Sequence, residues 1–185
     1  MIKITDLSVQ YGEHVVFDRY CCEFPLTGNT VIRGSSGSGK TTLLRILTGL
    51  QKPDSGHVFG LQGLRSTIVF QEDRLLPWYS ALKNVSLVSN QERAKLILTS
   101  LGLEGFMYEK PSALSGGMKR RVAIARALAF GGDLFLLDEP FSGLDENAKQ
   151  QTACVLKALE IPLLVVVHSE AEIKLINPQT VLNIK

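Results

Sequence analysis

The stretch GSSGSGKT occupies residues 34–41, between a short apolar run at residues 30–33 and a segment of helical periodicity at residues 41–50. It matches the pattern G-x-x-x-x-G-K-[S/T] in the required context, with a strand before it and a helix after it. Glycines allow the backbone to fold around a phosphate chain, and the N-terminus of the following helix adds positive potential. The alternative, a flexible Gly/Ser turn, is disfavoured by this placement between strand and helix. The stretch therefore predicts nucleotide binding.

Two side chains at the end of this loop have predicted roles of their own. Lys40 is predicted to reach the β- and γ-phosphates, and Thr41 to supply its hydroxyl to Mg²⁺. The loop by itself does not distinguish among the many reactions that phosphate-binding loops support.

The bulk composition is that of one globular domain. The chain has 185 residues, of which 45% are hydrophobic and 21% charged, enough for a single domain with its own core. A net charge of +2, with no basic run beyond residues 119–121, argues against nucleic acid as a partner.

The cysteines at 21, 22 and 154 match neither a metal-binding spacing nor a disulfide framework. We expect them to be buried thiols in a reducing cytosol.

The sequence shows no segment of membrane-spanning length. The longest apolar stretch, Ile161–Val167, falls well short of the ~20 residues required. The N-terminus has no basic region followed by an apolar core, so it does not resemble a signal peptide. We expect a cytoplasmic protein whose role at a membrane comes through a partner.

Apolar strands alternate with helical segments along most of the chain. Continuous apolar strands at residues 134–137 and 163–167 predict a parallel sheet covered by helices on both faces. Residues 2–11 and 15–24 are predicted to form an attached antiparallel β element. Helical patterns predict one helix over residues 84–101. Further helices are predicted at 115–131 and 146–160, and further strands at 57–60, 66–70 and 180–184.

Two carboxylates follow the buried strand at residues 134–137. Open α/β sheets bind ligands at the carboxyl ends of their strands, where Asp138 and Glu139 are expected to lie. Asp138 suits the Mg²⁺ shell, through water, and Glu139 suits a base that polarises an attacking water. A strand that ends in a solvated acidic turn is the alternative, and the phosphate loop in the same chain favours the functional interpretation.

A second glycine motif, LSGGM at residues 114–118, opens a predicted helix. Ser115 is a natural N-cap, and Gly116 and Gly117 expose backbone N–H groups at the positive end of the helix. A second anion-binding site in so short a domain makes sense if it closes on the γ-phosphate of a nucleotide held by another subunit.

These motifs together resemble the ABC ATPase family, and the resemblance covers nearly the whole chain. The signature of that family is commonly LSGGQ, and LSGGM occurs in part of its importer branch. Tyr11 resembles the aromatic residue that stacks on adenine, and Gln71 the Q-loop glutamine that senses Mg²⁺ and the transport partner. Residues 142–145 resemble the D-loop, and His168 the switch histidine that contacts the γ-phosphate. Tyr11 could instead be a packing residue, and His168 a strand cap.

The resemblance implies a P-loop NTPase fold, ATP and Mg²⁺ as ligands, and a set of site residues. The implied catalytic residues are Lys40, Gln71, Glu139 and His168. The implied ATP-binding residues are Tyr11, Gly34, Ser35, Ser36, Gly37, Ser38, Gly39, Lys40, Thr41 and Thr42, with Ser115, Gly116 and Gly117 acting on the nucleotide of the facing subunit. The implied Mg²⁺ ligands are Thr41, Gln71 and Asp138.

The segment QEDRLLPW at residues 71–78, with Asn84 and Val85 soon after, resembles ATPases of bacterial importers for nitrate, sulfonates and taurine. Trp78 suits either a docking site for a membrane subunit or the core of a helical subdomain. The alternatives to an importer subunit are a non-transport ABC-type ATPase and an ATP-dependent regulatory module. The two tandem cassettes or long coiled coils of the former are not found here.

The resemblance also implies a domain organisation and partners. We expect one ABC ATPase domain over residues 1–185. Its nucleotide-binding core with the β element would comprise residues 1–71 and 130–185, and its helical subdomain about 72–129. The expected partners are a second ATPase subunit, most simply an identical one, transmembrane permease subunits and an extracytoplasmic solute-binding protein. The protein would then lie on the inner face of the cell membrane, held there by the permease.

Overall fold

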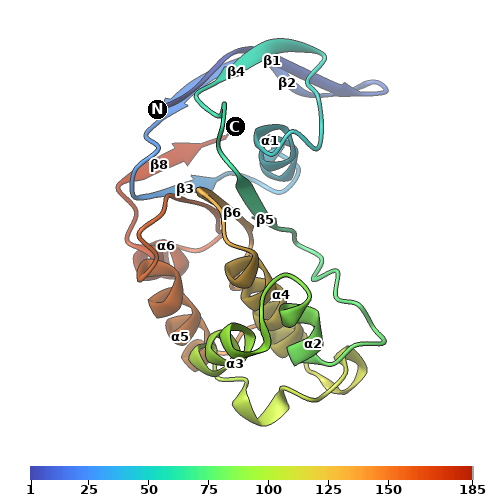
Figure 1. The fold of residues 1–185 in the computed structure, drawn as a ribbon. Coiled ribbons are helices and arrows are strands. Elements are labelled where there is room, and N and C mark those ends of the chain that lie inside the picture. The colour runs from blue at the N-terminus through green and yellow to red at the C-terminus, as the bar shows by residue number, and fades with distance from the viewer. Residues whose placement is uncertain (185) are drawn as a thin grey trace.

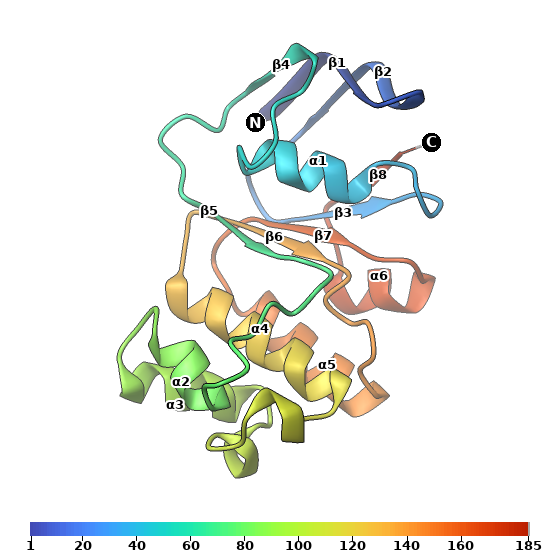
Figure 2. The ribbon, with the colours of Figure 1, turned by 90° about the vertical axis from the view of Figure 1, so that its right-hand side faces the viewer.

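The computed structural model describes residues 1–184, so the last residue of the predicted segment 130–185 lies outside it. A small sheet, one helix, a larger sheet and a layer of helices follow one another through the molecule (Figure 1, Figure 2). The strands are β1 (Ile2–Tyr11), β2 (His14–Phe24), β3 (Asn29–Arg33), β4 (Ser55–Phe59), β5 (Ser66–Val69), β6 (Leu134–Asp138), β7 (Leu163–Val166) and β8 (Thr180–Asn183). The α-helices are α1 (Lys40–Leu47), α2 (Ala81–Ser86), α3 (Gln91–Ser100), α4 (Gly116–Phe130), α5 (Glu146–Lys157) and α6 (Glu170–Ile176), and short 3₁₀ turns are η1 (Glu104–Phe106) and η2 (Pro111–Ala113).

The larger sheet has the strand order β5-β6-β7-β3-β8, and all of its neighbouring strands run parallel. Every residue of β6 and β7 is buried, because helices cover both faces of the sheet. The predicted fold class is confirmed. Since the strands are parallel, the loops after β3, β5, β6 and β7 all leave from the same edge of the sheet.

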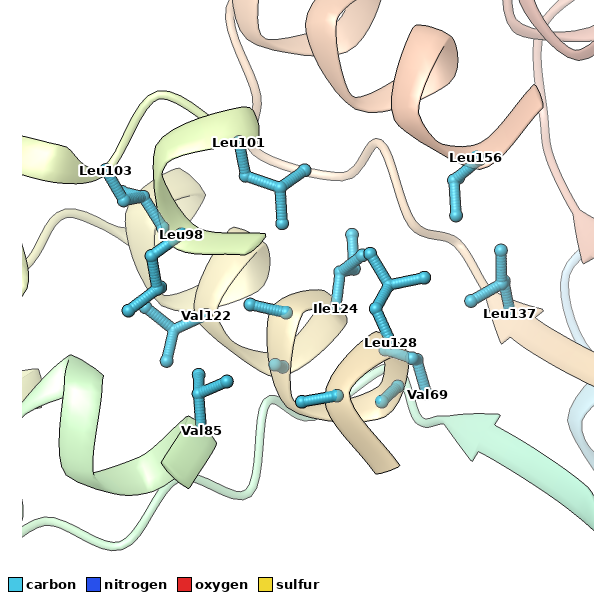
Figure 3. Packing of buried hydrophobic residues seen from close by; sticks show 14 of the residues in the cluster. Val69, Val85, Leu98, Leu101, Leu103, Val122, Ile124, Leu128, Leu137 and Leu156 are labelled. Atoms are coloured by element: carbon cyan, nitrogen blue, oxygen red, sulfur yellow. The ribbon is translucent and has the colours of Figure 1, made fainter. Parts of the chain in front are cut away.

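Successive residues of the central strands supply two separate cores. Leu134 and Leu136 of β6 pack in the core that contains α1 and β1, whereas Phe135 and Leu137 pack in the core that contains α4. This division follows from the two-residue repeat of a strand. In Figure 3, Leu137 lies opposite Leu156 of α5 and near the α4 side chains. Each fully buried leucine of this kind stabilises the fold by about 1.5–3 kcal/mol.

The smaller sheet has the order β2-β1-β4, and β1 pairs antiparallel with both neighbours. The predicted antiparallel β element is therefore confirmed, and β4 joins it from a distant part of the chain. Helix α1 lies between this sheet and the parallel sheet (Figure 2). Gly56 in β4 has φ of 91°, and a Cβ atom there would lie 2.4 Å from the carbonyl oxygen of Asp6. Glycine is thus required at this point for the two strands to approach.

The single helix predicted over residues 84–101 is wrong, because the structure has two helices, α2 and α3, in this region. Each begins at its own N-cap: the Ser80 hydroxyl accepts from Lys83 N–H, and the Asn90 side chain accepts from Arg93 N–H. Asparagine competes with the helical hydrogen-bond ladder in this way, so Asn90 starts a new helix within the predicted range rather than continuing the first one.

The expectation of buried cysteines is also wrong. Cys21 and Cys154 are exposed and Cys22 is partly buried, and all are free thiols. Burial raises the pKa of the Cys22 thiol.

No helix between residues 1 and 184 combines the length and apolar character needed to cross a bilayer.

The glycines that open α4 have different surroundings. A Cβ atom on Gly117 would lie 2.6 Å from the backbone carbonyl oxygen of Gly143, whereas one on Gly116 would meet nothing within 4 Å. The start of α4 therefore packs directly on the backbone after β6, and only a residue without a side chain allows this contact at position 117.

This contrast yields a test of the packing. Gly117→Ala is expected to lower the free energy of unfolding by about 1–3 kcal/mol, because the added methyl group forces the two backbones apart. Gly116→Ala is expected to be neutral or to stabilise by up to about 1 kcal/mol, because alanine favours a helix and its methyl group has space. Urea unfolding of both variants measures the difference. Equal stability of the two variants would contradict the close packing of Gly117 on Gly143.

Candidate functional site

An open cavity of about 320 Å³ lies at the carboxyl edge of the parallel sheet, beside the β1–β2 hairpin. Its lining includes most of the residues that the sequence singled out. Those residues are Tyr11, Ser36, Gly37, Gly39, Lys40, Thr41, Thr42, Gln71, Glu139 and His168. The hairpin and the loops after β3, β5, β6 and β7 thus meet at one place, as the parallel arrangement requires.

The phosphate loop connects β3 to the first turn of α1. Gly37 and Gly39 have φ of 80° and 92°, which favour glycine. A Cβ atom on Gly39 would also lie 2.6 Å from Val16 of β2, so the loop packs closely on the hairpin. Lys40 is 6% exposed, and its ammonium donates to the carbonyl oxygens of Gly34 at 3.0 Å and Ser35 at 2.7 Å.

The phosphate loop also contains a hydroxyl group, that of Ser38, which could accept a hydrogen bond from a ligand or donate one to it. The Ser38 hydroxyl oxygen is buried and makes no hydrogen bond to any of residues 1–184. Buried hydroxyl groups in proteins are normally hydrogen-bonded, so this orphaned group fits a loop built to bind a polar ligand. Gly34 and Ser35 line a neighbouring cavity rather than the main one.

Thr41, which lines the cavity, contacts the buried Asp138, which does not line it. The Thr41 hydroxyl donates to Asp138 Oδ2 at 2.6 Å. Asp138 is 1% exposed, and its burial raises the pKa of its carboxyl group, which the hydroxyl of Thr41 opposes. A buried carboxylate beside a hydroxyl is an oxygen donor set that suits Mg²⁺, which takes few protein ligands when a substrate phosphate supplies others. The residues present therefore fit the expected ion.

Glu139 and His168 form the second pair of the site. His168 Nε2 lies 2.6 Å from Glu139 Oε1. Glu139 has φ of 53°, which is uncommon for a residue with a side chain and costs of order 1 kcal/mol or more. Its backbone N–H donates to the Val166 carbonyl at 3.2 Å, so the end of β7 holds the strained residue. Glu139 lies directly after the last residue of β6 and lines the cavity.

Tyr11 and Gln71 lie at the edges of the cavity. Tyr11 is 48% exposed, and its hydroxyl donates to Gln51 Oε1 at 2.7 Å, so the ring is not packed in the core. Gln71 is exposed and comes two residues after the end of β5. His14 and Val16 also line the cavity, and sequence reasoning missed them. The turn between β1 and β2, which places His14 opposite Tyr11, was the available signal.

Ser115, Gly116 and Gly117 do not line this cavity. They stand at the N-terminus of α4, where the Ser115 hydroxyl accepts from Met118 N–H at 3.2 Å. Within one chain, the phosphate loop at α1 and the glycine motif at α4 therefore form separate helix N-termini, each suited to an anion.

Trp78 is 63% exposed, so it is not part of the core of the helical region. Its ring packs edge-on against Tyr79, with 6.2 Å between the centroids. The fully buried Asn84 holds this loop: its amide nitrogen donates to the carbonyls of Leu76 and Tyr79, each at 3.1 Å, and its oxygen accepts from Leu76 N–H at 2.8 Å. The aromatic pair is thus presented on a fixed loop.

Known proteins share both this sequence and this fold. The family model described as "ABC transporter" matches residues 22–142. The chain is 45% identical to the "Aliphatic sulfonates import ATP-binding protein SsuB 1" of Rhodococcus jostii, a match that covers 76% of this chain and 54% of that protein. It is 38% identical to the SsuB protein of Escherichia coli K12, with 92% of this chain and 72% of that protein covered. The chain thus spans between about half and three quarters of these relatives' lengths.

A solved structure of the ATP-binding cassette MJ0796, a dimer in a post-hydrolysis state bound to ADP and Pi, superposes with a TM-score of 0.88. The two chains are 28% identical, and the match covers 100% of this chain and 94% of that one. A second dimeric structure of MJ0796, a bacterial ABC transporter cassette, gives a TM-score of 0.87 at 29% identity. With the family match and relatives well above 30% identity, these likenesses confirm the resemblance seen in the sequence: the chain belongs to the ABC transporter family and has the fold of its ATP-binding cassettes.

Proposed function

We propose that this chain hydrolyses ATP as one half of a cassette dimer and thereby powers a bacterial small-solute importer. The observation that carries the proposal is the meeting of the phosphate loop with two polar pairs, Thr41–Asp138 and Glu139–His168, at one edge of the sheet. A loop that binds phosphate, a site for a hard cation and a carboxylate beside a histidine are the parts that phosphoryl transfer to water requires.

The geometry supports a distinct role for each group. Lys40 would exchange its contacts with the loop carbonyls for contacts with the β- and γ-phosphates. Glu139 would orient and polarise the attacking water, and His168, now bonded to Glu139, would reach the γ-phosphate. Thr41, Gln71 and Asp138 would hold Mg²⁺, which neutralises charge on the phosphates. Catalysis would then rest on positioning and electrostatic stabilisation.

The dimer completes each site. Ser115, Gly116 and Gly117 lie outside the cavity of their own chain, at a helix N-terminus whose exposed N–H groups suit a phosphate. We propose that they close on the γ-phosphate bound to the phosphate loop of a second copy. The dimeric cassette structures of MJ0796 support pairing of this kind.

The membrane partners are proposed from two observations. Relatives that match 92% of this chain are named as ATP-binding subunits for import of aliphatic sulfonates, so solutes of that class are the first to test. Trp78 is exposed on a loop fixed by Asn84, and such an aromatic residue suits an interface. We propose that the helical region, about residues 72–129, meets a permease there and holds this subunit at the inner face of the membrane, with a solute-binding protein outside. Glu139 and His168 disfavour a regulatory module without turnover, and a non-transport ATPase would not need the Trp78 loop.

The role of Glu139 gives the first functional test. Glu139→Gln is expected to lower the ATPase kcat by about 10²–10⁴-fold, since an amide does not accept a proton from the attacking water. Binding of a fluorescent ATP analogue is expected to stay intact, because the phosphate loop is unchanged. Glu146→Gln, on the exposed first turn of α5, is the matched control and should turn over normally. Normal turnover in Glu139→Gln would exclude this residue as the base.

The proposed site between two subunits can be tested in the Glu139→Gln variant, which should hydrolyse ATP slowly. With MgATP, the Glu139→Gln chain of 20.3 kDa is expected to double its mass in light scattering. Adding Gly116→Glu should abolish this dimer, because a carboxylate would face the γ-phosphate of the other subunit. A side chain at position 116 has space, so the double variant should still fold and bind ATP. Dimerisation that survives Gly116→Glu would contradict the proposed pairing.

The docking role of the Trp78 loop makes a separate prediction. When the chain is co-expressed with the permease subunits of a sulfonate importer, Trp78→Ala is expected to reduce co-purification by about tenfold or more, as for an aromatic interface anchor. Leu96→Ala, at a residue of α3 that is 72% exposed, is the control and should co-purify normally. ATP binding by both isolated variants should match that of the unaltered chain. Equal recovery of the permease by both variants would show that Trp78 does not contact it.

A further inference from the structure

Arg120 of α4 is a charged residue in an unusual place, because it is 3% exposed and faces the ends of two strands. Its Nη1 donates to the carbonyl oxygens of Phe70 and of Gln71, the latter at 3.3 Å. Its Nη2 donates to the carbonyl oxygen of Asp138. One guanidinium group therefore joins the helix that carries the glycine motif to the backbone after β5 and at the end of β6.

These carbonyls belong to the peptide units on either side of Gln71 and directly before Glu139, and the planes of these units set the orientation of both residues. The Phe70 and Gln71 carbonyls flank Gln71 on both sides, so both of its peptide planes are held. The Asp138 carbonyl shares a peptide unit with Glu139 N–H, which donates to Val166 at 3.2 Å. That peptide plane is thus clamped from α4 on one side and from β7 on the other, immediately before the strained φ of Glu139.

Stability alone gives little reason to bury this cation. Burial lowers the pKa of the Arg120 guanidinium, and its nearest carboxylate, Asp73 Oδ1, is 3.5 Å away. Buried ion pairs often stabilise a fold no better than apolar residues of similar size, because both groups lose their hydration. The planar fork of arginine, in contrast, can bond to several fixed acceptors at once, which a lysine ammonium does less well. The arrangement is suited to holding backbone groups in place.

We infer that Arg120 is a positioning residue that holds Gln71 and Glu139 in a fixed relation to the glycine motif at the start of α4. The inference rests on the proposed ATPase function and adds a structural connection between the glycine motif and the residues expected to act on the water and Mg²⁺. When α4 moves, both strand ends move with it, so the carboxylate and the glutamine align only when the helix is in place. Arg120 touches no substrate and acts through the peptide units that it holds.

Arg121 supplies a matched control on the same helix. Its Nη1 donates to the Leu101 carbonyl at 2.8 Å, within the helical region and away from β5 and β6. Arg120→Met and Arg121→Met each remove one arginine from α4 and keep a flexible apolar side chain. Three measurements compare them with the unaltered chain: ATPase kinetics, affinity for a fluorescent ATP analogue, and hydrogen exchange of the ligand-free protein resolved by peptide.

Arg120→Met is expected to lower kcat by about 10- to 100-fold, as a small misplacement of catalytic groups does, while affinity for the ATP analogue stays within about threefold. Peptides covering residues 69–76 and 136–142 should exchange about tenfold faster or more, because their carbonyls lose their anchor. Arg121→Met should keep its kcat and show faster exchange only around residues 101–107. Arg120→Lys should recover part of the rate, since an ammonium retains the charge and some of the bonds.

Several results would overturn the inference. These are unchanged exchange of the two peptides in Arg120→Met, a kcat within about twofold of the unaltered chain, or equal loss of kcat in both arginine variants. If Arg120→Met does not fold, the same comparison is made with Arg120→Lys, for which smaller changes in the same peptides are expected. Absence of ATP hydrolysis by the unaltered chain would refute the proposed function, while the exchange data would still decide the role of Arg120.

Discussion

The parallel pairing of β6 with β7, and of β7 with β3, is the constraint on which the site depends. It places the carboxyl ends of these strands at one edge, so the pair Asp138 and Glu139 comes together with Lys40 and His168, which lie far from it in the chain. The pairing persists because both faces of these strands are apolar, and α1 and α4 cover one face each. A strand turned the other way would carry its polar end to the opposite edge and leave the site incomplete.

The same edge concentrates the groups whose environment costs free energy. Asp138 is a buried carboxylate with a raised pKa, Glu139 is a strained residue, and Ser38 is a buried hydroxyl without a partner among the described residues. Local strain and unmet polar groups persist in a fold only where surrounding structure holds them, and they gather where a ligand acts. The two hydrophobic cores on either side of the sheet supply that support.

Helix α4 connects the two halves of the molecule. Its apolar face packs under β5 and β6, where Ile124 and Leu128 share a core with Val69 and Leu137 (Figure 3). Its N-terminus presents the glycine motif, and Gly117 packs on the backbone of Gly143. Its arginines hold backbone carbonyls: Arg120 at the ends of β5 and β6, and Arg126 those of Asp73 and Arg74. One helix therefore carries the glycine motif and contacts both the strand ends and the segment that leads to Trp78.

The fold class, the phosphate loop and the acid pair could be predicted from the sequence, because each depends on a local pattern of residue types with a direct physical reason; the family followed from the resemblance of the motifs to those of known ATPases. Local patterns failed where a short polar side chain competed with a longer periodicity, as at Asn90, which caps α3 and so separates it from α2 within the one predicted helix. They also left open whether Trp78 is core or surface. The folded chain was needed to show that Trp78 is exposed, that Glu139 contacts His168, and that Arg120 bonds to the carbonyls of Phe70 and Asp138. These contacts join residues far apart in the chain, and the packing of helices on a sheet, which no local pattern records, brings them together.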